Sequence, residues 1–191
     1  QTDLTTWEYS TNPILALRDF LTLENGLNAA TSDIHEARFI EMANACDDNI
    51  ALHASNSTTQ KRFTVNGVVA LDASKAEVAE ALLSTCNGSL VWSQGKYVPQ
   101  VGVAIPNSRN HTLTADNLRG GIKFTTRASK ATRMNAVRGV FVDAANTYKA
   151  TDFAHVKNST YATEDGEELY GDIDLPLTTN NVEAQRLAKQ V

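Results

Sequence analysis

The hydrophobic pattern of this chain changes period along its length, and this change limits the fold to one that combines helices with sheets. Over residues 13–22 and 75–85, apolar side chains recur every three or four positions, which is typical of amphipathic helices. Over residues 60–71 and 136–142 they alternate with polar or small residues, as in half-buried strands. We therefore predict a mixed α+β fold.

Residues typical of helix caps predict where the individual helices begin and end. Asn12 can cap a first helix that has Pro13 in its first turn, and Asn25-Gly26 is expected to end it. Residues spaced as capping boxes predict three further helix starts, at Asp33 with Glu36, Ser74 with Glu77, and Asn180 with Glu183. The sequence thus predicts a helix pair, then a helix followed by a hairpin on a small sheet, and a C-terminal helix.

Turn signals divide the rest of the chain. A hairpin is predicted around residues 93–96, with Gly95 at the bend. Residues 104–111 are polar and contain a proline, which marks a domain boundary. Beyond it we expect strands around residues 122–126 and 137–142, and a long irregular loop over residues 144–160.

The composition is that of a globular protein. Of the 191 residues, 42% are hydrophobic and the net charge is −5, so the chain can bury a core and is not expected to be disordered. No apolar run approaches the roughly 20 residues that a membrane-spanning helix needs. Cys46 and Cys86 are interpreted as buried free thiols. Because the chain opens at Gln1 without Met, we interpret it as a segment or processed product of a longer protein.

No catalytic or cofactor signature occurs in the sequence. The four histidines are scattered without metal-ligand spacing, and neither a nucleophile elbow nor a phosphate-binding glycine loop is present. We therefore expect no enzyme activity, no cofactor and no metal site.

Two blocks of opposite charge follow one another in the last third of the chain. Residues 117–142 contain six basic and no acidic side chains, and residues 158–180 contain six acidic side chains and no Lys or Arg. Either the blocks lie on neighbouring strands of one sheet, or they are complementary surfaces between copies of the protein. A nucleic-acid site is not predicted, because the basic residues are not interleaved with the aromatic rings that bind single strands: Phe124 is the only aromatic residue between Arg119 and Arg138. The candidate interface residues are Lys123, Arg127, Lys130, Arg133, Glu167 and Glu168.

A second functional interpretation starts from two carboxylates. Asp172 and Asp174 are one residue apart and would share one face of a strand, with Tyr170 beside them. Paired carboxylates next to an aromatic ring suit a carbohydrate-binding or carbohydrate-active module. The alternative is that these are solvated charges on an exposed face of a scaffold domain.

Several segments, taken in order, resemble the central tail-tip (tail hub) proteins of long-tailed, lambda-like bacteriophages and related prophages. The final segments are the most specific and lead into a closing helix. The segments are residues 7–13 (WEYSTNP), 16–21 (ALRDFL), 61–69 (KRFTVNGVV), 134–143 (MNAVRGVFVD) and 164–179 (EDGEELYGDIDLPLTT).

This resemblance implies a structural protein of the virion tail, assembled in the bacterial host cytoplasm. The chain would be a middle segment of a larger protein, three copies of which close the tail tube and support host attachment and DNA delivery. Its partners would be its own copies and other tail proteins. The resemblance implies an inserted α+β domain over 1–104, a portion of a β-rich, barrel-like hub domain over 112–178, and the start of a truncated helix over 179–191.

Overall fold

The computed structural model describes residues 8–52, 58–70, 72–104, 112, 114–121, 123–124, 126, 129 and 132–191. The helices are α1 (Pro13–Thr22), α2 (Glu36–Asp47), α3 (Lys75–Ser84), α4 (Ser159–Asp165) and α5 (Asn181–Ala188), with 3₁₀ turns η2 (Thr31–Asp33), η4 (Ala115–Asn117) and η6 (Ala144–Asn146). The strands are β1 (Asn49–Ala51), β2 (Thr59–Lys61), β3 (Ser89–Ser93), β4 (Lys96–Gln100), β5 (Ala136–Asp143), β6 (Lys149–Asp152), β7 (Val156–Lys157) and β8 (Tyr170–Leu175). The predicted α+β class with a C-terminal helix is confirmed.

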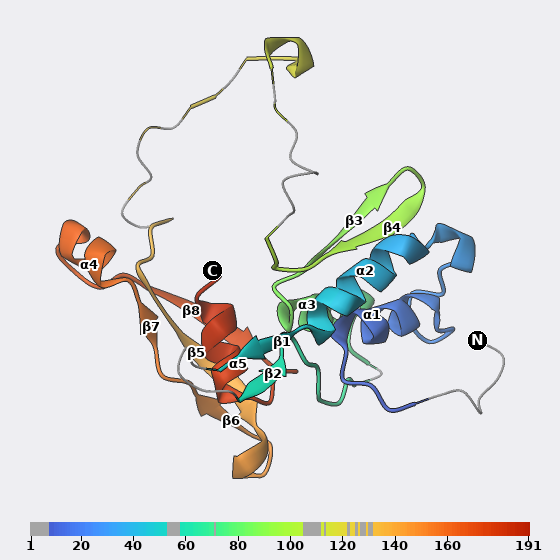
Figure 1. The fold of residues 1–191 in the computed structure, drawn as a ribbon, viewed down its shortest axis with the longest axis horizontal. Helices are drawn as coiled ribbons and strands as arrows, with labels where there is room; N and C mark the ends of the chain where they lie inside the picture. The colour runs from blue at the N-terminus through green and yellow to red at the C-terminus, as the bar shows by residue number, and fades with distance from the viewer. Residues whose placement is uncertain are drawn as a thin grey trace.

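The elements fall into two groups joined by a short connecting sheet. Figure 1 shows α1, α2, α3 and the β3–β4 hairpin at one end of the molecule, and the sheet of β5 to β8 with α5 at the other. The antiparallel pair β1–β2 lies between the two groups. The end of β2 therefore lies beside the C-terminal helix: Arg186 of α5 donates a hydrogen bond to the backbone carbonyl of Arg62, 124 residues earlier in the sequence.

Three helices, α1, α3 and α5, begin where their capping signals predict, and the first two also have the predicted side-chain contacts. The Asn12 side chain accepts hydrogen bonds from the backbone N–H groups of Ile14 and Leu15 at the start of α1. Both reciprocal hydrogen bonds of the capping box between Ser74 and Glu77 are present at the start of α3. These starts depend on residues adjacent in sequence, which is why sequence alone locates them.

The other two predicted capping boxes are wrong, because their glutamates bind distant residues. α2 begins at Glu36 and not near Asp33, since Asp33 ends a 3₁₀ turn and Glu36 forms an ion pair with Arg18. Asn180 does cap α5, but the Glu183 side chain hydrogen-bonds to Thr64. Tertiary contacts have replaced the local ones.

β5 is the central strand of the larger sheet. Along one edge it pairs antiparallel with β6 and β7, and along the other it pairs in parallel with β8. Among the described residues β8 pairs with no strand other than β5, so the sheet is open. The expectation of a barrel-like part is therefore wrong for this region, since closure requires every edge strand to find a second partner.

Three strand and loop predictions also need correction. Residues 144–160, expected to be an irregular loop, contain β6 and β7. The strand expected over residues 60–71 ends at Lys61, because the amides of Val65 and Asn66 donate to the carbonyls of Thr11 and Leu177 and not to a neighbouring strand. No strand covers the described positions among residues 122–126, where the Phe124 side chain is 81% exposed.

The hairpin of β3 and β4 has the turn that its sequence predicts. Gln94 and Gly95 both have positive φ angles, 53° and 74°, which suits the tight turn of a two-residue hairpin. The Trp92 and Tyr97 rings meet edge to face across the two strands, with centroids 4.6 Å apart. Trp92 is nevertheless 56% exposed, so the hairpin keeps an apolar surface open to solvent.

One hydrophobic core connects both groups of elements. It runs from Ile14 of α1 and Phe39 of α2 through Phe63 to Phe141 of β5 and Leu187 of α5. Cys46 and Cys86 lie in it as buried free thiols, as predicted. The proposed division at residues 104–112 stays a prediction. None of the helices in the described parts of the chain has the length and apolar character needed to cross a bilayer.

Candidate functional site

Two ion pairs, one of them between neighbouring strands, join the two charged blocks within one chain. Arg138 of β5 lies directly opposite Asp172 of β8, and its Nε donates to the Asp172 carboxylate at 2.6 Å. Arg133, just before β5, donates to Asp165 at the end of α4, also at 2.6 Å. The pairing within one sheet, one of the two interpretations of the sequence, is therefore observed at Arg138.

The six candidate interface residues are only partly brought together. Arg133 is partly buried against Asp165, and Glu168 accepts an ion-pair hydrogen bond from Lys157 of β7 at 2.8 Å. Glu167 is exposed, and its backbone carbonyl accepts from the Asn135 side chain. Lys123 is exposed, whereas Arg127 and Lys130 lie outside the described residues. The interface between copies stays a prediction.

Alternation along β5 and β8 gives their sheet two different faces. Val137, Phe141 and Leu175 are buried on the inner face, which α5 covers. On the outer face Arg138, Tyr170 and Asp172 are exposed. The outer face therefore presents the charged and aromatic side chains of this sheet to solvent.

A groove of about 770 Å³ lies on this outer face, and we call it the outer groove. It is formed by β5, β8, the end of β6 and the segment between β6 and β7. Its side chains include Arg138, Asp152, Phe153, His155, Tyr170 and Asp172. Tyr170 and Asp172, singled out by the sequence, are thus brought together, but Asp174 does not line the groove.

The Tyr170 ring is held by three neighbours. The Arg138 guanidinium carbon lies 5.2 Å from the ring centroid, in the range of a cation–π contact. The His155 ring meets the Tyr170 ring edge to face at a centroid distance of 5.9 Å. The Tyr170 hydroxyl donates to Glu168 at 2.5 Å. Contacts on several sides fix the orientation of this ring in the groove.

The same contacts keep the charged groups of the site ionised. The hydrogen bond from Arg138 lowers the pKa of Asp172 below its ordinary value, and the one from Lys157 lowers the pKa of Glu168. The hydrogen bond to the Glu168 carboxylate raises the pKa of the Tyr170 hydroxyl. At neutral pH the site thus contains neutral Tyr170 beside charged carboxylates and cations.

Sequence reasoning missed Arg138, Asp152 and His155 as members of this site. Arg138 was visible only as one of six basic residues, and its partner depends on the parallel register of β5 with β8. Asp152 and His155 fall in the stretch that was expected to be an irregular loop. The hydrophobic spacing of Phe153 and Val156 gave too weak a signal to reveal the strands on either side.

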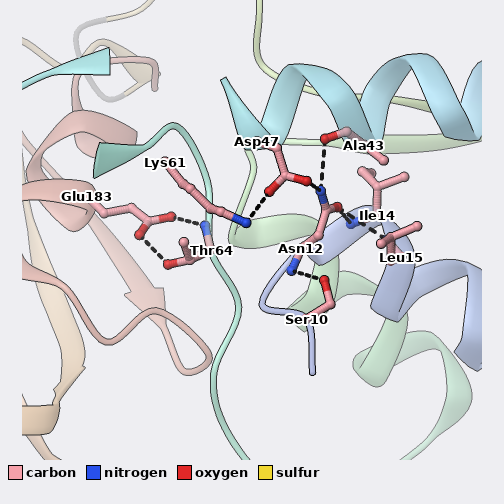
Figure 2. A network of polar contacts seen from close by, with 9 residues as sticks. All are labelled: Ser10, Asn12, Ile14, Leu15, Ala43, Asp47, Lys61, Thr64 and Glu183. Atoms are coloured by element: carbon pink, nitrogen blue, oxygen red, sulfur yellow. Dashed lines mark hydrogen bonds and ion pairs between the residues drawn. The ribbon is translucent and has the colours of Figure 1, made fainter. Parts of the chain in front are cut away.

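A second polar network connects the two groups of elements. Figure 2 shows Asn12 between α1 and α2, where its Nδ2 donates to the Ala43 carbonyl and to the Asp47 carboxylate. Nearby, the buried Glu183 carboxylate of α5 accepts from the N–H and the hydroxyl of Thr64, at 2.5 and 2.7 Å (Figure 2). Burial raises the pKa of Glu183 above its ordinary value. This network fixes the packing of the elements and is not a ligand site.

Among the described residues, no group of three or more His, Cys, Asp or Glu side chains is placed to hold a metal ion. Comparison with known proteins gives no match, either to a family model or to a curated protein sequence. Function therefore has to be proposed from the geometry and from the resemblance of the segments described above.

Proposed function

We propose that this chain is a structural part of a bacteriophage tail tip, a middle segment of a larger hub protein that closes the tail tube. Its role is assembly and the support of host attachment and DNA delivery, and not catalysis. The proposed partners are further copies of the same protein, in a trimer, and other proteins of the virion tail.

One observation carries this proposal: the segments that resemble tail hub proteins form the framework of the fold. Residues 134–143, in the most specific part of the resemblance, contain β5, with which every other strand of its sheet pairs. Residues 7–13 include the Asn12 cap of α1, and residues 164–179 include β8. A resemblance restricted to surface loops would say little, whereas framework segments in the same order support a shared architecture.

The surface is also suited to contacts with other subunits. Val91 and Trp92 on β3 are 52% and 56% exposed, and β8 lies at an edge of its sheet among the described residues. Exposed apolar side chains and open strand edges are features through which protein chains associate. They support an assembly role without identifying the contact.

Light scattering after gel filtration tests the proposal on this chain and on the longer protein that contains it. A trimeric longer protein is the expected result, even if the segment alone is monomeric. A longer protein that stays monomeric at high concentration would overturn the ring-forming proposal.

The basic block is tested by charge reversal at Arg127 and Arg133. If these side chains face another copy, the double variant R127E/R133E assembles less well in low salt, where exposed charges are least screened. The swap R133D/D165R is the matched control, because it restores the ion pair observed inside the chain. Unchanged assembly of the double variant would mean that the basic block takes no part in the ring.

A further inference from the structure

We propose that the outer groove is a binding site for an uncharged oligosaccharide. Tyr170 and His155 supply an aromatic wall, and the paired side chains of Arg138 and Asp172 supply hydrogen bonds to sugar hydroxyls. This function is separate from the proposed assembly role and does not depend on it.

The size and lining of the groove suit such a ligand. Its volume of about 770 Å³ lies within the range of sites that hold small molecules. Apolar surface comes from the ring of Tyr170, which is 38% exposed, while Phe153, 4% exposed, closes the floor of the groove as part of the core. A pyranose ring presents C–H groups on its faces and hydroxyls around its rim, so it requires apolar and polar contacts side by side.

The orientation of the wall is set before any ligand binds. The Tyr170 ring is held by Arg138, His155 and Glu168 through the contacts given above. An aromatic side chain that is already fixed loses little conformational entropy when a ligand packs against it. Such preorganisation matters most for sugars, whose individual contacts are weak.

The charge balance favours an uncharged ligand over an ion. Arg138 is already neutralised by Asp172, with its Nε 2.6 Å from the carboxylate. An anionic ligand would have to compete with Asp172 and would also meet Asp152, which lines the same groove. A cationic ligand would be repelled by the Arg138 guanidinium.

A sugar hydroxyl avoids this conflict, because it donates one hydrogen bond and accepts others. It can therefore accept from the Arg138 guanidinium and donate to the Asp172 carboxylate while the ion pair stays in place. Both side chains are well exposed, at 59% and 70%, so hydroxyls can reach them. The pair thus offers complementary donors and acceptors at one position.

The test is a titration calorimetry screen of the chain with maltotriose, cellotriose, triacetylchitotriose and lactose. We expect one of these probes to bind, and Tyr170→Ala to weaken that binding by about tenfold or more. Tyr170→Phe keeps the ring and loses only the hydroxyl contact to Glu168, so it should bind nearly as well as the wild type. Arg138→Met should also weaken binding, because it removes the donors.

The matched control is Tyr161→Ala, which removes another exposed tyrosine, on α4, outside the outer groove. It should change the affinity by less than about twofold. Thermal unfolding of each variant shows whether it is folded. The proposal is overturned if none of the four probes binds, or if Tyr170→Ala binds as tightly as the wild type.

Oligomeric state separates this proposal from the assembly role. If saccharide binding is absent and Tyr170→Ala disrupts the trimer of the longer protein, the outer face is a subunit contact and the saccharide proposal is wrong. If Tyr170→Ala loses the saccharide and the trimer forms normally, the groove is a ligand site on an assembled hub. If the longer protein binds a saccharide and never forms a trimer, the binding-site proposal holds and the proposed assembly role is wrong.

Discussion

Replacing Asn12 by alanine should destabilise the protein far more than the loss of an ordinary helix cap. Asn12 is 1% exposed, and its amide acts in two directions. Its Oδ1 accepts from the first turn of α1, while its Nδ2 donates to the Ala43 carbonyl at 2.8 Å and to the Asp47 carboxylate at 2.9 Å. One side chain therefore caps α1 and joins it to the C-terminal end of α2 (Figure 2).

The expected cost follows from these three roles. Loss of a helix cap costs about 1 kcal/mol. Loss of the hydrogen bond to the buried Ala43 carbonyl costs about 1 kcal/mol, and of the one to the charged Asp47 about 1.5 kcal/mol. Because neighbouring contributions are not fully additive, we expect a total of about 3 kcal/mol. Lys61 still pairs with Asp47 in the variant, so Asp47 is not left isolated.

Ser74→Ala is the matched control. Ser74 also caps a helix, α3, but it is exposed and its side chain contacts only the capping box. Its loss should cost about 1 kcal/mol. For a chain of this size that corresponds to a fall of about 2–4 °C in melting temperature, against about 6–12 °C for Asn12→Ala.

Urea unfolding of both variants, followed by far-UV circular dichroism, measures the difference directly. The free energy of unfolding should fall with urea concentration at the same slope as in the wild type, so that the shift in the unfolding midpoint measures the change in stability. If Asn12→Ala costs no more than Ser74→Ala, the two hydrogen bonds from Nδ2 contribute nothing, and the proposed link between α1 and α2 is wrong.

Two further predictions concern the sheet and α5. Gly139→Ala should lower the free energy of unfolding by about 2 kcal/mol or more, because the new Cβ would lie 1.9 Å from the Ile173 carbonyl oxygen of β8. Chemical denaturation measures this loss. Gly120→Ala is the control, since a Cβ at Gly120 would meet no atom within 4 Å. Burial raises the pKa of Glu183, so the folded state retains its proton to higher pH than the unfolded state, and stability is lost as pH rises above about 4.5. The urea midpoint of unfolding, measured over a range of pH, should therefore fall less steeply for Glu183→Gln than for the wild type. The same pH dependence in both proteins would contradict this prediction.

Sequence could predict those parts of the fold that depend on neighbouring residues. The cap at Asn12, the capping box of α3 and the turn at Gly95 each involve residues within a few positions, and all three are confirmed. The hydrogen bonds of Glu183 could not be predicted, because its partner, Thr64, is 119 residues away and only the folded core brings them together. Local capping rules assigned that glutamate to the wrong contact for this reason.

The outer groove illustrates the same limit for a functional site. Tyr170 and Asp172 could be placed on one face from their spacing in β8, but the residues opposite them depend on the register with β5. His155 and Asp152 enter the site only because β6 and β7 fold back along the other edge of β5. A site made of side chains from three strands and one connecting segment leaves no compact motif in the sequence.

The parallel register of β5 and β8 also changes what the two charged blocks can mean. Because Arg138 pairs with Asp172 inside the chain, their opposite charges no longer argue for contact between copies. The same holds for Arg133 and Asp165. On the outer face the pair neutralises Arg138 beside an aromatic wall, which suits an uncharged ligand better than an anion. The charges of Arg138 and Arg133 are thus accounted for by pairs inside the chain, and the specificity of the outer face has to come from the shape of the groove and its hydrogen bonds.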